Sequence, residues 1–263
     1  MPFLSTQYTT LYYDVFESDF TTPGKKSQKS SVLLIHGFAG TSESDFAGQL
    51  PVLRQKYRVV APHRHGYGRS THRQAYALTF YRDDAADLAA LLDTLHIEQT
   101  LVLGFSDGGI VGLLLAALYP ARVKALAVMG AQPTINARNT ADIRHWLLEK
   151  PLPQEWQEEL ATLHGDPYWR SLPSMYVEGQ DALVAAAGVI ISDEELANIS
   201  CPALIMHGKR DRIVPADYAS VLHKHIAGSE LVLFDAGHAA HLRCEQEYTS
   251  AVLDFFSRHN SST

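Results

Sequence analysis

The sequence predicts an α/β fold, in which a mostly parallel sheet carries helices on both faces and a helical cap is inserted. Short, continuous apolar runs alternate with stretches of helical periodicity, as expected for parallel strands buried on both faces. One apolar run leads into a Gly-x-Ser-x-Gly motif at residues 104–108, and a helical stretch follows the motif. The alternation stops at residue 131 and resumes at residue 199. We therefore expect a core of residues 1–130 and 199–263, with residues 131–198 as the cap.

Composition limits the class of protein. The 263 residues are 46% hydrophobic, which suits one globular α/β domain with one insertion. The 22 basic and 29 acidic side chains give a net charge of −7 without a basic patch, so nucleic acid is not an expected partner. Every apolar run is too short to span a membrane, and no membrane partner is expected. A small-molecule substrate and a monomer or small homo-oligomer are the expectations.

The sequence also bears on location and cofactors. Its first residues lack the basic and apolar regions of a signal peptide. Cys201 and Cys244 make no disulfide framework, so we expect reduced thiols and a cytoplasmic location. The 13 histidines show no metal-ligand spacing, and we expect neither a metal nor an organic cofactor.

The N-terminal elements lead to a glycine-rich loop. Tyr8–Glu17 alternates loosely, as edge strands do, and Thr21–Ser31 is a polar turn. Val32–Ile35 is a continuous apolar run, which predicts a buried strand. This strand runs directly into the loop His36–Gly40, which can turn backbone N–H groups toward a developing negative charge.

Three elements follow this loop. Phe46–Tyr57 is predicted as a helix, Arg58–Pro62 as a buried strand and Tyr81–Leu95 as a second helix, from its apolar spacing. His63 and His65, after the strand, suggest a pair of metal ligands, but no further ligand accompanies them. We expect them to pack beside the floor of the site.

The Gly-x-Ser-x-Gly motif joins a strand, Thr100–Leu103, to a helix, Ile110–Leu118. A turn this sharp crowds the backbone, so the positions flanking the central serine must lack side chains. The serine is then forced out at the top of the sheet, next to a helix N-terminus. This arrangement is a nucleophile elbow, and Ser106 is the candidate nucleophile.

The elbow helix is followed by a strand, Val123–Gly130, and then by the predicted cap. The cap contains Trp146, Trp156 and Trp169, several prolines and many acidic residues. We expect its aromatic residues to form mostly the cap core and its acidic residues mostly solvated faces. Some cap residues must line the substrate pocket, and the sequence does not identify them.

Two more predicted strands carry the partners that a serine nucleophile needs. Asp211 follows the strand at residues 202–206, and His238 follows the strand at residues 230–234. Both side chains would emerge at the carboxyl edge of a parallel sheet, where Ser106 also emerges. Because a serine hydroxyl needs a base and the base needs an orienting acid, His238 and Asp211 are assigned to these roles.

Two nearby residues compete for the same roles. His241 could be the base, but its position at the start of the last helix favours packing. Asp235 could be the acid, but it precedes the loop, so Asp211 ranks first.

Acyl transfer is the chemistry that these residues predict. Ser106 attacks an ester carbonyl while His238 takes its proton, and water then releases the acyl-enzyme. The backbone N–H groups of Phe38 and Asp107 hold the oxyanion. We also expect Gly37 and Asp107 to contact the substrate.

The chain resembles the α/β-hydrolase superfamily over nearly its full length, and within it the valacyclovir hydrolase (biphenyl hydrolase-like) group. The resemblance implies that Ser106, Asp211 and His238 form a catalytic triad in a serine hydrolase. The residues that match are Gly37, Gly40, Asp45–Phe46, Gly104–Ile110, Cys201–Gly208, Asp211, Val214–Pro215, His223–His225 and His238–Arg243.

The resemblance also raises two questions about substrate choice. His63 and His65 replace the aspartate and the arginine of the usual Pro-Asp-x-Arg-Gly pattern. In the group it resembles, the acid after the nucleophile is implied to hold a substrate ammonium group. Asp107 has that position, but an acid in the first turn of a helix also stabilises the helix dipole. Both roles remain open at this stage.

Other functions fit the same motifs. A C–C bond hydrolase or a lactonase would use the same triad and differ in the cap. A non-catalytic ligand-binding scaffold is also possible on this fold. A dehalogenase or epoxide hydrolase is disfavoured, because these enzymes need a carboxylate where Ser106 stands.

Overall fold

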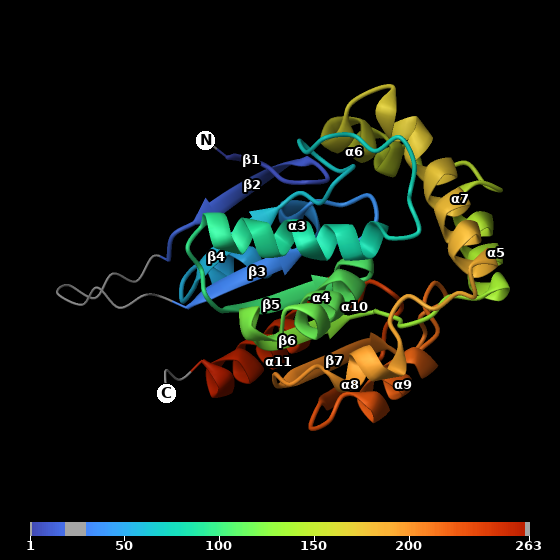
Figure 1. The fold of residues 1–263 in the computed structure, drawn as a ribbon. Helices are drawn as coiled ribbons and strands as arrows, with labels where there is room; N and C mark the ends of the chain where they lie inside the picture. Colours follow the sequence, from blue (N-terminus) through green and yellow to red (C-terminus); the bar gives the residue numbers. More distant parts are fainter. Residues whose placement is uncertain (1, 19–29, 261–263) are drawn as a thin grey trace.

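A computed structural model describes residues 2–18 and 30–260. Its sheet has the strand order β1-β2-β4-β3-β5-β6-β7-β8, and β3 to β8 pair in parallel (Figure 1). The strands are β1 (Phe3–Ser5), β2 (Thr10–Phe16), β3 (Ser31–Ile35), β4 (Arg58–Pro62), β5 (Thr100–Phe105), β6 (Val123–Met129), β7 (Ala203–Gly208) and β8 (Glu230–Phe234). The predicted α/β fold is confirmed. The polar turn predicted at 21–31 falls mostly outside the described residues.

Helices pack on both faces of this sheet. They are α1 (Ser42–Asp45), α2 (Leu50–Leu53), α3 (Phe80–Thr94), α4 (Asp107–Leu118), α5 (Ala137–Leu147), α6 (Gln154–His164), α7 (Leu172–Ala185), α8 (Asp193–Ala197), α9 (Asp217–His225), α10 (Ala240–Arg243) and α11 (Glu245–His259), with short 3₁₀ turns η1 (Pro120–Arg122) and η2 (Tyr168–Ser171). Strand β3 shows how one strand serves both faces. Leu33 and Ile35 join the apolar layer of α3 and α4, while Val32 and Leu34 join that of α11.

The helix predicted at Phe46–Tyr57 is wrong in its boundaries. The chain forms two short helices there, α1 before residue 46 and α2 from residue 50. Thr41 caps α1 and starts it early, because its side chain accepts the N–H of Ser44. Pro51 has no N–H to donate and lies in the first turn of α2, where none is needed.

The segment predicted as the cap is helical and mostly stands apart from the sheet. In Figure 1, α5, α6 and α7 lie beyond the carboxyl ends of the parallel strands. The last helix of this segment, α8, packs instead against α4 and α9. The helices that can cover the site are therefore α5, α6 and α7. Within the described ranges, no helix is long and apolar enough to cross a membrane.

Candidate active site

Ser106 occupies a strained turn between β5 and α4. Its φ of 53° and ψ of −122° lie in a region that residues with side chains rarely adopt. A Cβ atom on Gly108 would lie 2.0 Å from the carbonyl oxygen of Ile35, and one on Gly104 would lie 2.5 Å from that of Gly108. Both glycines are thus required by close backbone approach, as the motif predicts for a nucleophile elbow.

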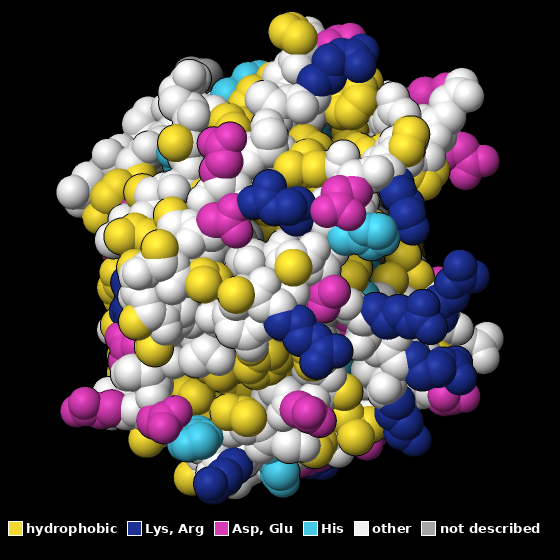
Figure 2. All heavy atoms as spheres, turned by 90° about the vertical axis from the view of Figure 1, so that its right-hand side faces the viewer, with side chains coloured by type: hydrophobic (Ala, Val, Ile, Leu, Met, Phe, Trp, Pro, Cys, Tyr) yellow, Lys and Arg dark blue, Asp and Glu magenta, His cyan; other side chains and the backbone are white. Residues whose placement is uncertain are grey.

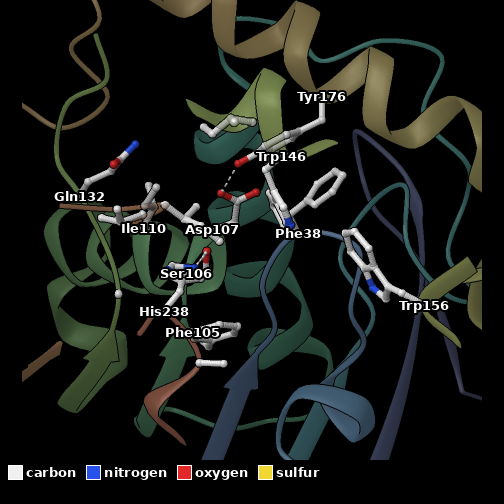
Figure 3. A pocket seen from close by; sticks show the side chains of 15 residues that line it. Phe38, Phe105, Ser106, Asp107, Ile110, Gln132, Trp146, Trp156, Tyr176 and His238 are labelled. Atoms are coloured by element: carbon white, nitrogen blue, oxygen red, sulfur yellow. Dashed lines mark hydrogen bonds between the residues drawn. The ribbon is translucent and has the colours of Figure 1, made fainter. Parts of the chain in front are cut away.

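The structure brings the three predicted residues together. Nε2 of His238 lies 2.8 Å from Oγ of Ser106, and Nδ1 lies 2.7 Å from Oδ2 of Asp211. The three residues follow the carboxyl ends of β5, β7 and β8, so parallel pairing places them at one edge. Figure 3 shows two of them, Ser106 and His238, side by side at the cavity. His238 can therefore take a proton from Ser106 while Asp211 orients its ring.

Asp211 is held in its ionised form. Burial alone would raise its pKa, but hydrogen bonds from His207 and His238 and from the N–H of Val214 outweigh burial and hold the pKa well below its usual range. Its Oδ1 accepts the N–H groups of Ile213 and Val214, each at 2.9 Å. The carboxylate is therefore fixed in position and charged when His238 becomes protonated.

The two competing residues take other places. His241 is 1% exposed and lies against Phe105, with ring centroids 4.1 Å apart. Burial, with a further contribution from His238, lowers the pKa of His241 to about 4. Asp235 forms an exposed ion pair with Arg210 at 2.8 Å. In this geometry both residues stay outside the Ser106–His238–Asp211 chain.

The glycine-rich loop after β3 faces the elbow. Phe38 lines the same cavity as Ser106, and Asp107 is the first residue of α4, where a backbone N–H has no acceptor within the helix. Gly37, which we expect to contact the substrate, lies next to the elbow, where an added Cβ would be 3.2 Å from Cβ of Ser106. Its N–H donates to Oδ2 of Asp45 at 2.7 Å. This bond helps to hold the loop in place, and the substrate contact stays a prediction.

A cavity of about 280 Å³ opens onto Ser106. The indole rings of Trp146 and Trp156 stack 5.3 Å apart, and both line the cavity (Figure 3). Trp169 packs into a buried cluster instead. Trp146 and Trp156 are therefore among the cap aromatic residues that line the pocket, whereas Trp169 belongs to the cap core. The lining residues of the cavity are Phe38, Phe105, Ser106, Asp107, Ile110, Gly130, Gln132, Ile143, Trp146, Trp156, Tyr176, Ile213, Val214, His238 and Ala239.

Figure 2 shows the face of the molecule that carries the cap. Hydrophobic side chains are exposed there between charged side chains.

The carboxyl group of Asp107 is buried at the cavity wall. Its Oδ1 accepts hydrogen bonds from the hydroxyls of Tyr81 and Tyr176, each at 2.8 Å. Its Oδ2 has no hydrogen-bond partner among the described residues and lies 3.8 Å from Nη2 of Arg64. Burial raises the pKa of Asp107, although Arg64 and the two hydroxyls oppose the rise. One oxygen is thus held by the protein and the other is left without a donor.

Arg64 lies beneath this carboxyl group. It is 1% exposed, and its guanidinium forms an ion pair with Asp84 at 2.8 Å. Arg73 forms a second ion pair with Asp84. Two buried cations thus balance the carboxylates of Asp84 and Asp107, because an unpaired buried charge is costly. Arg64 stands at the variable position, x, of the Pro-Asp-x-Arg-Gly pattern.

His63, at the aspartate position of the pattern, helps to hold the loop that follows β4. Its Nδ1 accepts the N–H of Arg69 at 3.0 Å, and its Nε2 lies 2.9 Å from Oε2 of Glu43. His65 remains beside the loop, and burial together with Arg73 lowers its pKa to about 4. His63 and His65 thus have different surroundings. No group of three candidate metal ligands occurs among the described residues.

Several residues of the site were missed from the sequence. Helical periodicity placed Tyr81 on an apolar face, but gave no sign that its hydroxyl meets Asp107. Gln132 is 4% exposed, lines the cavity, and its Oε1 has no partner in the described chain. Tyr176 and Arg64 carried no local pattern at all. Their roles depend on contacts between distant segments.

Comparisons with known proteins identify the family of this chain. The family model for the alpha/beta hydrolase fold matches residues 30–243, and the chain belongs to this family. It is a hydrolase. Serine hydrolase BPHL of Homo sapiens is 32% identical over 234 residues, which are 86% of this chain and 78% of that protein.

Two further relatives broaden this picture. The putative carbamate hydrolase RutD of Escherichia coli is 29% identical over 242 residues, which are 85% of this chain and 90% of that protein. A solved 2-hydroxy-6-oxo-6-phenylhexa-2,4-dienoate hydrolase from Rhodococcus sp. strain RHA1 has a TM-score of 0.79 at 22% identity, covering 97% of this chain and 98% of that one. That structure supports the fold alone.

Proposed function

We propose that this protein is a serine carboxylesterase for small esters. The observation that carries the proposal is the hydrogen-bonded chain from Ser106 through His238 to Asp211, with its serine open to a largely apolar cavity. A weak nucleophile, a base within 2.8 Å and an orienting acid are what acyl transfer requires.

The reaction has two steps. In the first, Oγ of Ser106 attacks the ester carbonyl and Nε2 of His238 takes its proton, then returns it to the departing alcohol. The N–H groups of Phe38 and Asp107 stabilise the tetrahedral oxyanion. In the second step, His238 takes a proton from a water molecule that attacks the acyl-enzyme. It then gives this proton to Oγ of Ser106 as the bond to the acyl group breaks and the acid is released. The Asp211 carboxylate stabilises the protonated ring in both steps.

A preference for amino-acid esters is the finer part of the proposal. Asp107 lines the cavity, and its buried Oδ2 has no hydrogen-bond donor among the described residues, so a substrate ammonium group that reached it would supply one. The Arg64 guanidinium, 3.8 Å from this oxygen, already balances part of its charge. We therefore expect a preference of about tenfold, below what an uncompensated carboxylate would give.

Other substrates remain candidates on the same residues. The human relative is named a serine hydrolase and the bacterial one a putative carbamate hydrolase, so carbamates belong in any substrate panel. A C–C bond hydrolase or a lactonase would use the same serine, base and acid.

The test is hydrolysis of p-nitrophenyl esters of increasing acyl length, together with an amino-acid ester and its des-amino analogue. We expect Ser106→Ala to lower kcat by at least about 10⁴-fold, because the nucleophile is lost. Asp107→Asn should lower kcat/KM for the amino ester about tenfold more than for the analogue, because the charge is removed. Because the pKa of Asp107 is raised, the preference should also fade on acidification earlier than for an ordinary carboxyl group.

The controls separate the possible failures. A fluorophosphonate probe should label Ser106 in the wild type and leave Ser106→Ala unlabelled. Labelling without ester turnover would exclude the simple esterase and direct the search to carbamates, lactones and C–C substrates. No labelling at all would favour a non-catalytic scaffold. Equal turnover of the amino ester and its analogue would remove only the amino-ester preference.

A further inference from the structure

His164 belongs to the cap but bonds to the core. It is the last residue of α6 and is 2% exposed. Its Nδ1 accepts the N–H of Gly68 at 2.8 Å, and its Nε2 lies 2.9 Å from the carbonyl oxygen of Ala39. Because an amide N–H only donates and a carbonyl only accepts, the ring must be neutral with its hydrogen on Nε2. One side chain thus joins the cap to two separate core loops.

Ala39 lies in the loop that carries the proposed oxyanion donor. It follows Phe38 directly and has a φ of 60°, in the left-handed region that a residue with a side chain seldom adopts. Such a conformation persists when the surroundings hold it. The loop is held at both ends, by Asp45 at the N–H of Gly37 and by His164 at the carbonyl of Ala39. Phe38 lies between these two anchors.

Apolar packing supports the same contact. Ala39, Leu160 and Trp169 form a buried cluster, and Phe38 and Trp156 pack against it. Leu160 comes from α6 and Trp169 from η2, so the cap rests directly on this loop. Apolar packing is not directional, so by itself it does not fix the orientation of the Ala39 carbonyl. The hydrogen bond from His164 does, because it requires a defined distance and angle.

We propose that His164 is a positioning residue, which holds the Ala39 carbonyl and thereby aims the N–H of Phe38 at the oxyanion. The oxyanion loop is therefore completed by one hydrogen bond from the cap, the bond of His164 to Ala39, and rapid hydrolysis requires this bond. This inference rests on the proposed function, because the role of the Phe38 N–H belongs to it.

The protonation state of His164 suits this role. Burial, with smaller contributions from the nearby His63 and His72, lowers its pKa to about 4, although the hydrogen bond to Ala39 opposes this shift. The ring is therefore neutral near neutral pH, as both hydrogen bonds require. Tyr67 packs edge-on against it, with ring centroids 5.9 Å apart, and helps fix its plane.

Two substitutions of His164 test its two hydrogen bonds separately, because each keeps one bond and removes the other. In His164→Gln, the side-chain amide reaches the place of Nε2 and donates to Ala39, while the bond to Gly68 is lost. In His164→Asn, the shorter side chain reaches the place of Nδ1 and accepts from Gly68, while Ala39 is released. We expect kcat to fall about tenfold to a hundredfold in His164→Asn with KM little changed, because an oxyanion donor is misplaced. His164→Gln should keep kcat within about threefold of the wild type.

Tyr168→Phe is the matched control for loosening of the cap. The Tyr168 hydroxyl donates to the carbonyl of Gly66 at 2.9 Å and accepts the N–H of Arg73 at 3.0 Å. It therefore ties the cap to the loop that follows β4 without touching the oxyanion loop. We expect Tyr168→Phe to lower the melting temperature and leave kcat near the wild-type value.

A second measurement isolates the oxyanion loop. An alkyl trifluoromethyl ketone forms a tetrahedral adduct with the serine, so its affinity should fall in His164→Asn in parallel with kcat. Nitrogen NMR of the wild type should show His164 neutral with its hydrogen on Nε2. A hydrogen on Nδ1 would overturn the inference without the use of any variant.

The remaining outcomes are distinct. Equal kcat losses in His164→Asn, His164→Gln and Tyr168→Phe would mean general cap docking and would overturn the inference. Wild-type kcat in all three, with ester hydrolysis intact, would do the same and leave the proposed function standing. A wild type that neither hydrolyses esters nor reacts with a fluorophosphonate would overturn both proposals.

Discussion

The core and the cap meet at the cavity, and they contribute different things. From the core come Ser106, His238 and Asp211, each at the carboxyl end of a parallel strand. From the cap come Trp146 and Trp156, which form part of the cavity wall. The core therefore holds the residues proposed to react, and the cap shapes the space for the substrate.

The two regions also differ in how tightly the backbone is packed. At Gly108 an added Cβ would overlap the β3 backbone, whereas at Gly165, where α6 ends, it would meet nothing within 4 Å. The core turn thus has no space for a side chain, whereas the cap turn has the space and favours glycine only through its φ of 79°. Changes of equal size should consequently have unequal effects in the two regions.

The largest effect is expected at the core turn. Gly108→Ala places a methyl group against a backbone oxygen that cannot move aside, so the elbow must shift and the serine with it. We expect nearly complete loss of activity and a loss of unfolding free energy at or above the upper end of about 1–3 kcal/mol. Steady-state kinetics and urea unfolding measure the two effects.

Gly112→Ala, in the same helix, is the control. Its added Cβ would meet only the ends of side chains, at 3.3 Å from Leu126 and from Val102. Better helix propensity offsets this crowding, so stability should change by less than about 1 kcal/mol. Similar losses in both variants would refute the claim that backbone contact is what makes Gly108 necessary.

An intermediate effect is expected in the cap wall. Trp156→Ala removes a large aromatic surface from the cavity and the stacking partner of Trp146. We expect KM for long or aromatic acyl esters to rise about tenfold, while kcat for the acetyl ester changes by less than about threefold, since a pocket contact contributes about 1–3 kcal/mol.

Leu148→Ala is the matched cap control, because Leu148 is exposed and outside the cavity wall. It should leave all the kinetic constants near their wild-type values. A fall in kcat for every ester in Trp156→Ala would contradict the division between a reacting core and a selecting cap.

The smallest effect is expected on the cap surface. Arg144 on α5 pairs with Asp181 on α7, and both side chains are 44% exposed. An exposed pair of this kind contributes about 0–1 kcal/mol and is screened by salt. Arg144→Gln should therefore lower the melting temperature slightly at low salt and not at all at high salt.

Arg82→Gln gives the comparison across the two regions. Arg82 on α3 donates from Nη1 and Nη2 to the two carboxylate oxygens of Glu195 on α8, at 2.7 and 3.0 Å. Its Nη2 also donates to the carbonyl of Ile190. This ion pair is bidentate and less exposed than the pair of Arg144 with Asp181. Arg82→Gln should therefore lower the melting temperature more than Arg144→Gln does. A larger effect for Arg144→Gln would mean that the packing of α5 on α7 depends on charge.

The sequence by itself determined the fold class and the three residues of the proposed triad. These follow from local rules, because a Gly-x-Ser-x-Gly turn forces its serine outward and parallel strands present their carboxyl ends at one edge. The ends of the helices do not follow from these rules. Where the sequence predicts one helix at Phe46–Tyr57, the chain forms the two short helices α1 and α2. Propensity alone does not locate a helix end that capping and tertiary contacts decide.

Tertiary structure alone decided the support of the site and the shape of its cavity. Tyr176 meets Asp107 across 69 residues of chain, and His164 meets Ala39 across 125. No periodicity encodes such pairs, because they depend on how the cap is seated on the core. The direction of Arg64 depends likewise on Asp84, which only folding brings within 2.8 Å. Contacts of this kind are selected by packing and by the cost of leaving a buried polar group unpaired, and both act only once the chain has folded.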